Sequence, residues 1–190
     1  IESTIIRPGY DFNEIYPLNI RQKNKKVIIG GLYNEGSKRN SKRTDWIFKT
    51  FEYLKIKYDI ELWMFGTDGT PKLSILSNFY KNPDPKTKNE FYNKCDIWLS
   101  PSELEGLHIA PAEAMLTRCP VIGTNDYLIN KETGLISNNN LKDFIKCTEK
   151  LINDCELRTK LGNNGRNKVL SLGDRKENMS KLISLLSMKA

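Results

Sequence analysis

The sequence holds few of the residues that build disulfide-stabilised, metal-bound or membrane-spanning proteins. Its 190 residues include only four cysteines and one histidine, and the cysteines lie 24, 28 and 8 residues apart, spacings that match no zinc or redox signature. No apolar run approaches the roughly 20 residues that cross a bilayer, and the N-terminus lacks the basic-then-apolar layout of a secretory signal. We therefore expect a soluble chain with reduced thiols in the cytoplasm.

Several recurring patterns are also missing. The sequence has no internal repeat, no low-complexity tract and no heptad seam. No Gly-x-Gly-x-x-Gly opens the first helix that the sequence predicts, so the usual pyrophosphate-binding turn of dinucleotide-dependent oxidoreductases is absent. This absence disfavours an oxidoreductase of that kind.

What the sequence does have is the composition of an ordinary globular domain. It is 38% hydrophobic and 28% charged, with 12 glycines and 8 prolines, which is typical of a folded protein rather than a disordered one. A chain of this length buries one sizeable core and is too short for two domains of ordinary size. Because the first residue is Ile1 rather than methionine, we expect the natural protein to have residues upstream.

From Val27 onward, short apolar runs alternate with amphipathic stretches, which is typical of β-α units around a parallel sheet. After Asn140 the pattern becomes entirely helical. We therefore expect an α/β fold, a Rossmann-like parallel sheet flanked by helices, with a helical C-terminal tail. The first 26 residues are predicted to be a linker from an upstream domain, and residues 27–190 the folded domain. The predicted strands are 27–30, 60–65, 73–76, 97–99, 119–122 and 133–136, and the predicted helices are 45–57, 86–95, 112–117, 141–153, 156–171 and 175–188.

The net charge of +7 favours anionic partners, which include nucleic acid, an acidic membrane surface and the phosphates of a small ligand. Basic runs lie at residues 21–26 and 38–43. A nucleic-acid-binding module would also expose aromatic residues for stacking, whereas the aromatic residues here follow the periodicity of buried positions. The charge alone does not choose among these partners, but the buried periodicity of the aromatic residues disfavours a nucleic-acid-binding module.

The stretch from Ser100 to Thr124 carries the most chemistry, because it places Glu-Gly, a helix start and a second glutamate between two apolar strands. In an open parallel sheet, ligands sit in the crevice beyond the carboxyl ends of the strands. Gly106 allows the backbone to approach a ligand closely, and a helix that begins near residues 109–111 directs free N–H groups into the same space. This arrangement predicts an anion site that needs no basic side chain.

The same stretch resembles a known family. Glu105 and Glu113 are separated by seven residues, and the surrounding S-x-x-E-G-L-x-x-x-P-x-E-A-M-x-x-x-x-P-V-I is similar to the E-x7-E signature of the retaining glycosyltransferases of the GT-B fold, group 1 (family 4). Further segments are similar to the linker, the first phosphate loop and two strand ends of that family: 7–11, 30–32, 42–45, 64–69 and 133–136. The resemblance covers nearly the whole chain and implies the C-terminal, donor-binding domain.

The resemblance also implies roles for individual residues. Glu105 would hold the hydroxyls of the transferred sugar, and Glu113 the ribose of the nucleotide. The backbone amides of Gly106 and Leu107 would face the diphosphate, and His108 would contact phosphate or sugar. The family stabilises the leaving diphosphate with a basic pair on the first β-α loop. The candidate catalytic residues are Glu105, Lys42 and Arg43, and the candidate donor-binding residues are Gly31, Lys38, Arg39, Gly66, Gly106, Leu107, His108 and Glu113.

The sequence departs from the family pattern at three places. Gly31-Leu32 stands where the family has Gly-Arg, and Lys38, Arg39 and the basic pair supply cations on the following loop. Arg118 stands where glycine is common, and residues 125–127 replace a Gly-Gly-x-x-Glu segment. The cation that substitutes for the missing arginine is left open by the sequence.

The resulting hypothesis is a metal-independent retaining glycosyltransferase that transfers a hexose from a nucleoside-diphosphate sugar to a glycan, lipid-linked or protein acceptor. No Asp-x-Asp occurs to hold a divalent cation, and no cofactor is expected. The partners are the nucleotide sugar and an N-terminal acceptor domain missing from this chain, and the basic surface is compatible with peripheral membrane association of the whole protein. The alternative is a degenerate, non-catalytic partner subunit.

Overall fold

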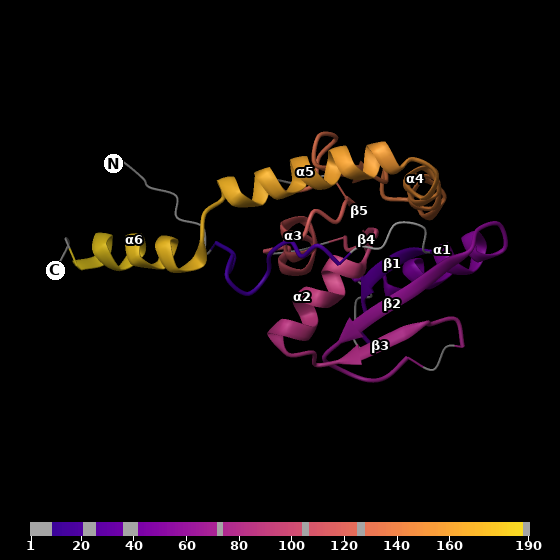
Figure 1. Cartoon of the computed structure of the whole chain (residues 1–190), viewed down its shortest axis with the longest axis horizontal. Helices are drawn as coiled ribbons and strands as arrows, with labels where there is room; N and C mark the ends of the chain where they lie inside the picture. The colour runs from indigo at the N-terminus through magenta and orange to yellow at the C-terminus, as the bar shows by residue number, and fades with distance from the viewer. Residues whose placement is uncertain are drawn as a thin grey trace.

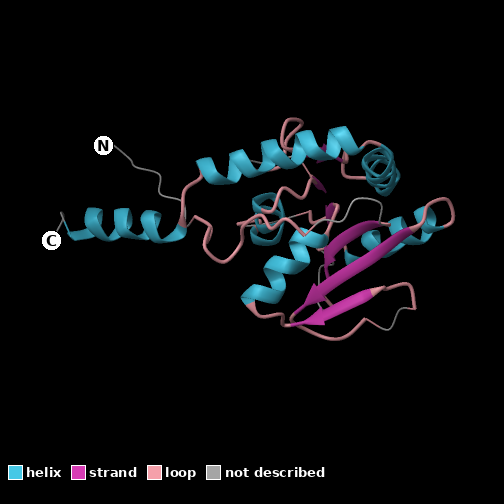
Figure 2. Cartoon of the chain, in the orientation of Figure 1, coloured by secondary structure: helices cyan, strands magenta, loops and turns pink. Residues whose placement is uncertain are grey.

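The computed structural model describes residues 9–20, 26–35, 42–71, 74–103, 107–124 and 128–187. Six strands form one sheet in the order β3-β2-β1-β4-β5-β6, and every neighbouring pair is parallel. Figures 1 and 2 show this sheet with helices on both of its faces. The strands are β1 (Val27–Leu32), β2 (Ile60–Gly66), β3 (Asn78–Lys81), β4 (Ile97–Ser100), β5 (Val121–Gly123) and β6 (Gly134–Ile136). The expected α/β, Rossmann-like fold is confirmed.

The helices divide between the two faces of the sheet. One core cluster unites inward side chains of α1 and α4 with alternate residues of the strands, and the other does so for α2 and α3. Helix α5 contributes Leu161 to the first cluster and Val169 to the second. Within β1, for example, Ile28 joins the second cluster and Ile29 the first. Because the central strands are buried on both faces, they appear in the sequence as short continuous apolar runs. The helices are α1 (Thr44–Lys55), α2 (Pro85–Lys94), α3 (Ile109–Leu116), α4 (Leu141–Asn153), α5 (Cys155–Ser171) and α6 (Arg175–Ser187).

The predicted strand at residues 73–76 is wrong. The residues described there, 74–76, form a turn, and β3 begins only at Asn78, where the chain pairs with Trp63 of β2. Ile75 and Leu76 pack against the core from this turn, which explains their apolar character. β3 itself lies at the edge of the sheet and has only partly buried or exposed residues, so it lacks the apolar run of a central strand.

Other boundaries differ from the predicted ranges by one to three residues. α3 begins at Ile109, within the range 109–111 expected for the helix start and three residues before the predicted range of 112–117. The predicted strand at 119–122 is shifted, because the Cys119 amide still donates to the Ala114 carbonyl at the end of α3 and β5 begins at Val121. The three C-terminal helices lie where the sequence places them, to within one residue.

The helix α5 approaches α3 very closely at two glycines. A Cβ added to Gly162 would lie 2.2 Å from the backbone oxygen of Arg118, and one added to Gly165 would lie 2.9 Å from the Met115 side chain. Arg166 of α5 also donates to the Leu116 carbonyl at the end of α3. The contacts with α5 therefore fix the position of α3.

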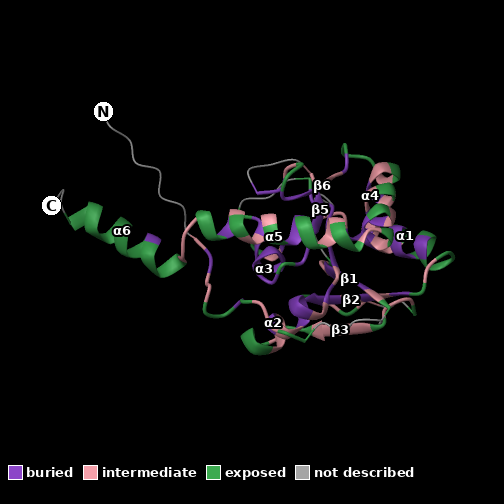
Figure 3. Cartoon of the chain, turned by 45° about the horizontal axis from the view of Figure 1, so that its top comes forward, coloured by how far each residue is buried: buried purple, intermediate pink, exposed green. Residues whose placement is uncertain are grey.

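The N-terminal segment meets the junction between α5 and α6. The Tyr10 amide donates to the Gly173 carbonyl, and the Arg175 amide donates to the Tyr10 carbonyl. Tyr10 and Ile15 are buried in the core, so residues 9–20, which the sequence assigns to a linker, pack on the domain. Helix α6 projects from the body, and among its described residues only Asn178 is buried (Figures 1 and 3). The division of the chain at residue 26 stays a prediction.

Candidate functional site

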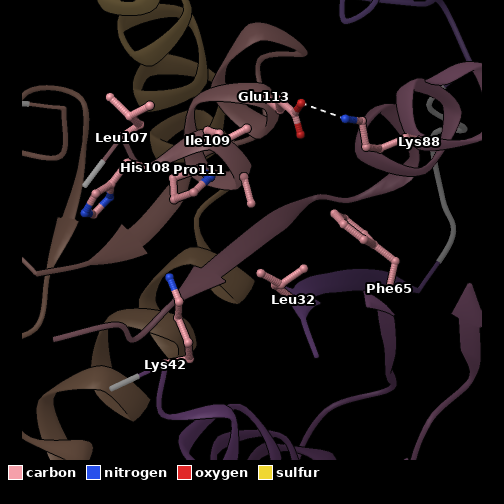
Figure 4. A pocket seen from close by; sticks show the side chains of 10 residues that line it. Leu32, Lys42, Phe65, Lys88, Leu107, His108, Ile109, Pro111 and Glu113 are labelled. Atoms are coloured by element: carbon pink, nitrogen blue, oxygen red, sulfur yellow. Dashed lines mark hydrogen bonds and ion pairs between the residues drawn. The ribbon is translucent and has the colours of Figure 1, made fainter. Parts of the chain in front are cut away.

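A pocket of about 460 Å³ opens at the carboxyl edge of the sheet. The chain adds β2 and β3 on one side of β1, and it adds β5 and β6 on the opposite side of β4. The order of strand addition therefore reverses between β1 and β4, although these two strands are parallel. Ligands of doubly wound folds bind at this switch point. Figure 4 shows the residues that line the pocket: Leu32, Lys42, Phe65, Lys88, Leu107, His108, Ile109, Ala110, Pro111 and Glu113.

The first turn of α3 forms one wall of this pocket. His108, the residue before the helix, has φ 46° and ψ 46°, and no side chain caps the helix start. The first amides of a helix have no partner within the helix, and they carry the positive end of its dipole. Pro111 sits in this first turn, where a missing N–H costs no hydrogen bond. The structure thus has the predicted helix start at the pocket, an arrangement that suits a phosphate group.

The N-terminal segment holds Leu107, two residues before the start of α3. The Tyr10 hydroxyl donates to the Leu107 carbonyl over 2.8 Å. Leu107 and Ile109 nevertheless expose nearly half of their surface, 46% and 47%, and both line the pocket. The rim at this wall is therefore apolar, with the backbone of the helix start beneath it.

Glu113 lies on the side of the pocket where α2 meets α3. Its Oε1 accepts from the Lys88 ammonium at 2.7 Å, and its Oε2 accepts from the Tyr92 hydroxyl at 2.9 Å. Burial, and after it the charge of Glu113, raises the pKa of Tyr92 well above its usual value. The phenol therefore stays protonated and always donates. The carboxylate is a charged acceptor with two fixed partners.

The neighbouring cations Lys42 and Arg43 have different surroundings. Lys42 lines the pocket on a side apart from the Lys88–Glu113 pair (Figure 4). The Arg43 guanidinium instead pairs with Glu103 at 3.0 Å, donates to the Asn139 side chain and lies 4.5 Å above the ring of Trp46. Lys42 is thus placed to meet an anion, while Arg43 joins three structural elements, and its catalytic role stays a prediction.

Two of the three glycines predicted to bind the donor have clear packing roles. A Cβ on Gly31 would lie 2.8 Å from the Ile47 side chain of α1, and one on Gly66 would lie 2.6 Å from the Tyr33 carbonyl oxygen. Neither belongs to the lining of the pocket at α3. Their contact with a donor stays a prediction.

Several predicted residues lie outside the described residues, so the structure does not place them: Lys38, Arg39, Glu105 and Gly106. Of the others, it brings Lys42, Leu107, His108 and Glu113 together around one pocket. The sequence reasoning missed Lys88 and Tyr92. Their spacing of four residues places them on one face of α2. This spacing is the sequence feature that could have identified them as a pair.

Comparison with known proteins gives the class. The family model described as "Glycosyl transferases group 1" matches residues 36–168, and the chain belongs to this family. The fold is that of the C-terminal domain of GT-B glycosyltransferases, as the sequence predicts.

Among curated relatives, the capsular polysaccharide biosynthesis glycosyltransferase CapM of Staphylococcus aureus is 38% identical over 85 residues, which cover 42% of this chain and 22% of CapM. An uncharacterized glycosyltransferase of Haemophilus influenzae is 27% identical over 175 residues, which cover 81% of this chain and 47% of that protein. The chain therefore spans less than half of the length of either relative.

Solved structures show the same fold. Sucrose-phosphate synthase from Thermosynechococcus elongatus matches with a TM-score of 0.74 at 18% identity, over 96% of this chain and 52% of that one. The C-terminal domain of the group 1 glycosyl transferase LpcC from Francisella tularensis matches with a TM-score of 0.70 at 23% identity, over 86% and 97%. S. aureus TarM, in a complex with fondaparinux, α-GlcNAc-glycerol and UDP, matches with a TM-score of 0.68 at 18% identity, over 97% and 38%.

Over the part of the chain that the structure describes, no helix combines the length and the apolar character that a membrane crossing requires.

Proposed function

We propose that this chain is the donor-binding domain of a retaining glycosyltransferase, which transfers a hexose from a nucleoside-diphosphate sugar to a glycan, lipid-linked or protein acceptor. The observation that carries the proposal is the single pocket wall formed by the start of α3, with Glu113 one turn further along the same helix. A helix start suits the diphosphate, and a carboxylate accepts hydrogen bonds from the two hydroxyls of a ribose. The family and the UDP complex of the TarM relative support a nucleotide ligand.

In this proposal each described residue has a distinct task. The first amides of α3 and the Lys42 ammonium hold the diphosphate, and Glu113 holds the ribose. As the sugar leaves, negative charge grows on the diphosphate, and a fixed cation or donor lowers the barrier by about 3 kcal/mol. Lys42 supplies that charge on the α1 side of the pocket.

The finer points of the proposal rest on the sequence. Metal independence is proposed because no Asp-x-Asp is present in the chain, and no cofactor is assigned. The transferred sugar keeps its anomeric configuration, and Glu105 contacts its hydroxyls, as the family resemblance implies. The acceptor is held by an N-terminal domain of the longer protein, so this chain alone binds donor weakly and transfers little sugar. The reaction takes place in the cytoplasm, with the whole protein at the membrane face where the acceptor is lipid-linked.

Calorimetric titration of the chain with UDP, GDP and ADP and their common sugar conjugates tests the proposal. We expect one nucleotide to bind, with the same affinity in the presence of a chelator. Glu113→Gln keeps an acceptor for Tyr92 but removes the charge, and we expect it to weaken binding about 10- to 100-fold, since hydrogen bonds to charged groups contribute about 1.5–3 kcal/mol. Glu132→Gln, at an exposed position, is the matched control.

Three outcomes contradict parts of the proposal. If no nucleotide binds while circular dichroism shows the fold intact, the chain is a degenerate, non-catalytic partner or its site is complete only with the N-terminal domain. If the chelator abolishes binding, metal independence is wrong. The stereochemical course is tested on the longer protein, by following the anomeric proton of the product by NMR, and an inverted product contradicts retention.

A further inference from the structure

Helix α2 directs two hydrogen-bond donors at one carboxylate of the neighbouring helix. Lys88 reaches Oε1 of Glu113 over 2.7 Å, and Tyr92 reaches Oε2 over 2.9 Å. The two donors are four residues apart, so they lie on one face of α2. The start of α2 is itself fixed, because the Asp84 side chain accepts from the amides of Lys86 and Thr87. The pair of donors is thus part of a rigid element.

The donor on the buried side has no freedom to change its role. Tyr92 is fully buried, and its ring packs against the rings of Phe65, Phe91 and Trp98 at centroid distances of 5.6, 6.0 and 5.0 Å. Burial raises the pKa of its hydroxyl well above the usual value. A neutral phenol has one proton to donate, and that proton goes to Glu113. The orientation of Oε2 is therefore fixed from the core.

The donor on the open side belongs to the pocket itself. The Lys88 side chain is 23% exposed, that of Glu113 is 12% exposed, and both line the pocket. Figure 4 shows the ammonium meeting the carboxylate at the pocket wall. A carboxylate oxygen accepts more than one hydrogen bond, so this contact leaves Glu113 able to meet a ligand. A carboxylate held in place before binding loses less conformational entropy when it binds.

We propose that Lys88 and Tyr92 are positioning residues that hold the Glu113 carboxylate ready for the ribose hydroxyls of the nucleotide, and that Lys88 thereby sets the preference for a ribonucleotide over its 2′-deoxy form. The inference rests on the proposed nucleotide-sugar function and adds two residues of α2 to it. Both side chains act through Glu113. Their loss therefore affects recognition of the ribose more than recognition of the phosphates.

The test compares UDP, GDP and ADP with their 2′-deoxy counterparts by calorimetry on the 190-residue chain. The variants are Lys88→Met, which keeps the length of the side chain, Lys88→Arg, which keeps the charge, and Tyr92→Phe, which keeps the ring packing. Lys86→Met, at an exposed position of the same helix, is the control. Thermal melting of every variant reports whether the fold is kept.

We expect the wild-type chain to prefer the ribonucleotide by about tenfold, the effect of one hydrogen bond to a charged group. In Lys88→Met and Tyr92→Phe this ratio should fall to about threefold or less, while affinity for the 2′-deoxy form changes less than about twofold. Lys88→Arg should restore most of the ratio, and Lys86→Met should keep all of it.

Three results overturn the inference, and they separate it from the proposed function. If the wild-type chain binds a nucleotide but the ratio is the same in Lys88→Met and Tyr92→Phe, the positioning role is wrong and the donor site stands. If these variants lose affinity for both forms equally and melt earlier, the two residues are structural only. If the wild-type chain binds no nucleotide at all, the proposed function and the inference fall together.

Discussion

Helices α1 and α3 both begin directly after a residue in the left-handed backbone conformation. Arg43 before α1 has φ 49° and ψ 41°, and His108 before α3 has φ 46° and ψ 46°. Neither helix start has a side-chain cap, and both starts follow strands at the carboxyl edge of the sheet. The side chains differ completely. The Arg43 guanidinium is held by Glu103, Asn139 and Trp46, whereas His108 is buried at the wall of the pocket.

A left-handed residue before a helix thus serves two different purposes in this chain. At α1 the left-handed residue sends its side chain into structural contacts, and its neighbour Lys42 lines the pocket. At α3 the left-handed residue lines the pocket itself. Substitutions at the two helix starts should therefore separate effects on ligand binding from effects on stability.

The largest effect is expected from Lys42→Ala, on the α1 side. It removes a cation that lines the pocket, so nucleotide affinity should fall about 10- to 100-fold. The loss should shrink at high salt, because charge attraction is screened. Calorimetry at two salt concentrations measures it. Lys49→Ala, which breaks only an exposed pair with Asp45, is the control, and equal losses in both variants would contradict a site at Lys42.

His108→Gly should have the next largest effect, on the α3 side. It removes the ring from the pocket wall and relieves the cost of the left-handed backbone, about 1–2 kcal/mol. We expect nucleotide affinity to fall about five- to tenfold, as for one hydrogen bond, while the lost packing of the buried ring opposes the backbone gain in melting temperature. Asn82→Gly, at an exposed residue with φ 46°, is the matched control for the backbone effect. Unchanged affinity in His108→Gly would remove this residue from the site.

Arg43→Ala should change stability rather than binding. It removes an ion pair and a cation–π contact, which together contribute about 1–2 kcal/mol to the free energy of unfolding. Chemical denaturation measures this loss, and nucleotide affinity should stay within about twofold of wild type. The catalytic role predicted from the sequence requires the opposite result. A large loss of affinity or of transfer at unchanged stability would support that role. It would contradict a purely structural function of Arg43.

Arg43→Lys should have the smallest effect. It keeps the charge beside Glu103, but it loses the planar group that stacks on Trp46 and donates to Asn139. The loss of stability in denaturation should be smaller than in Arg43→Ala. A loss as large as that of alanine would show that planarity, and not charge, holds this contact.

Much of the fold follows from the sequence because the central strands are buried on both faces. β1, β2 and β4 appear as apolar runs for that reason. The edge strand β3 could not be found in the same way, because its position depends on pairing with β2 and its residues are polar or half-exposed. The apolar residues 75–76 just before it drew the prediction to the wrong place.

The candidate site was predictable where one segment builds it. Glu113 and the helix start lie within a few residues of each other, so their spacing reports the geometry. Lys88 and Tyr92 come from α2, and their meeting with Glu113 depends on how two helices pack, which local spacing does not encode. The different surroundings of Lys42 and Arg43 were likewise not predictable from local spacing, because they depend on neighbours from other segments.

The close approach of α5 to α3 influences the width of the pocket, because α3 forms one of its walls. Gly162 and Gly165 lack side chains where α5 contacts α3 and the residues just after it. A methyl group at either position would displace α3 away from α5, and the pocket wall that carries Glu113 would move with α3. The width of the pocket can thus be tuned from positions that do not line it. Directed evolution of this chain toward larger or smaller donors could therefore begin at these two glycines, with every lining side chain left as it is.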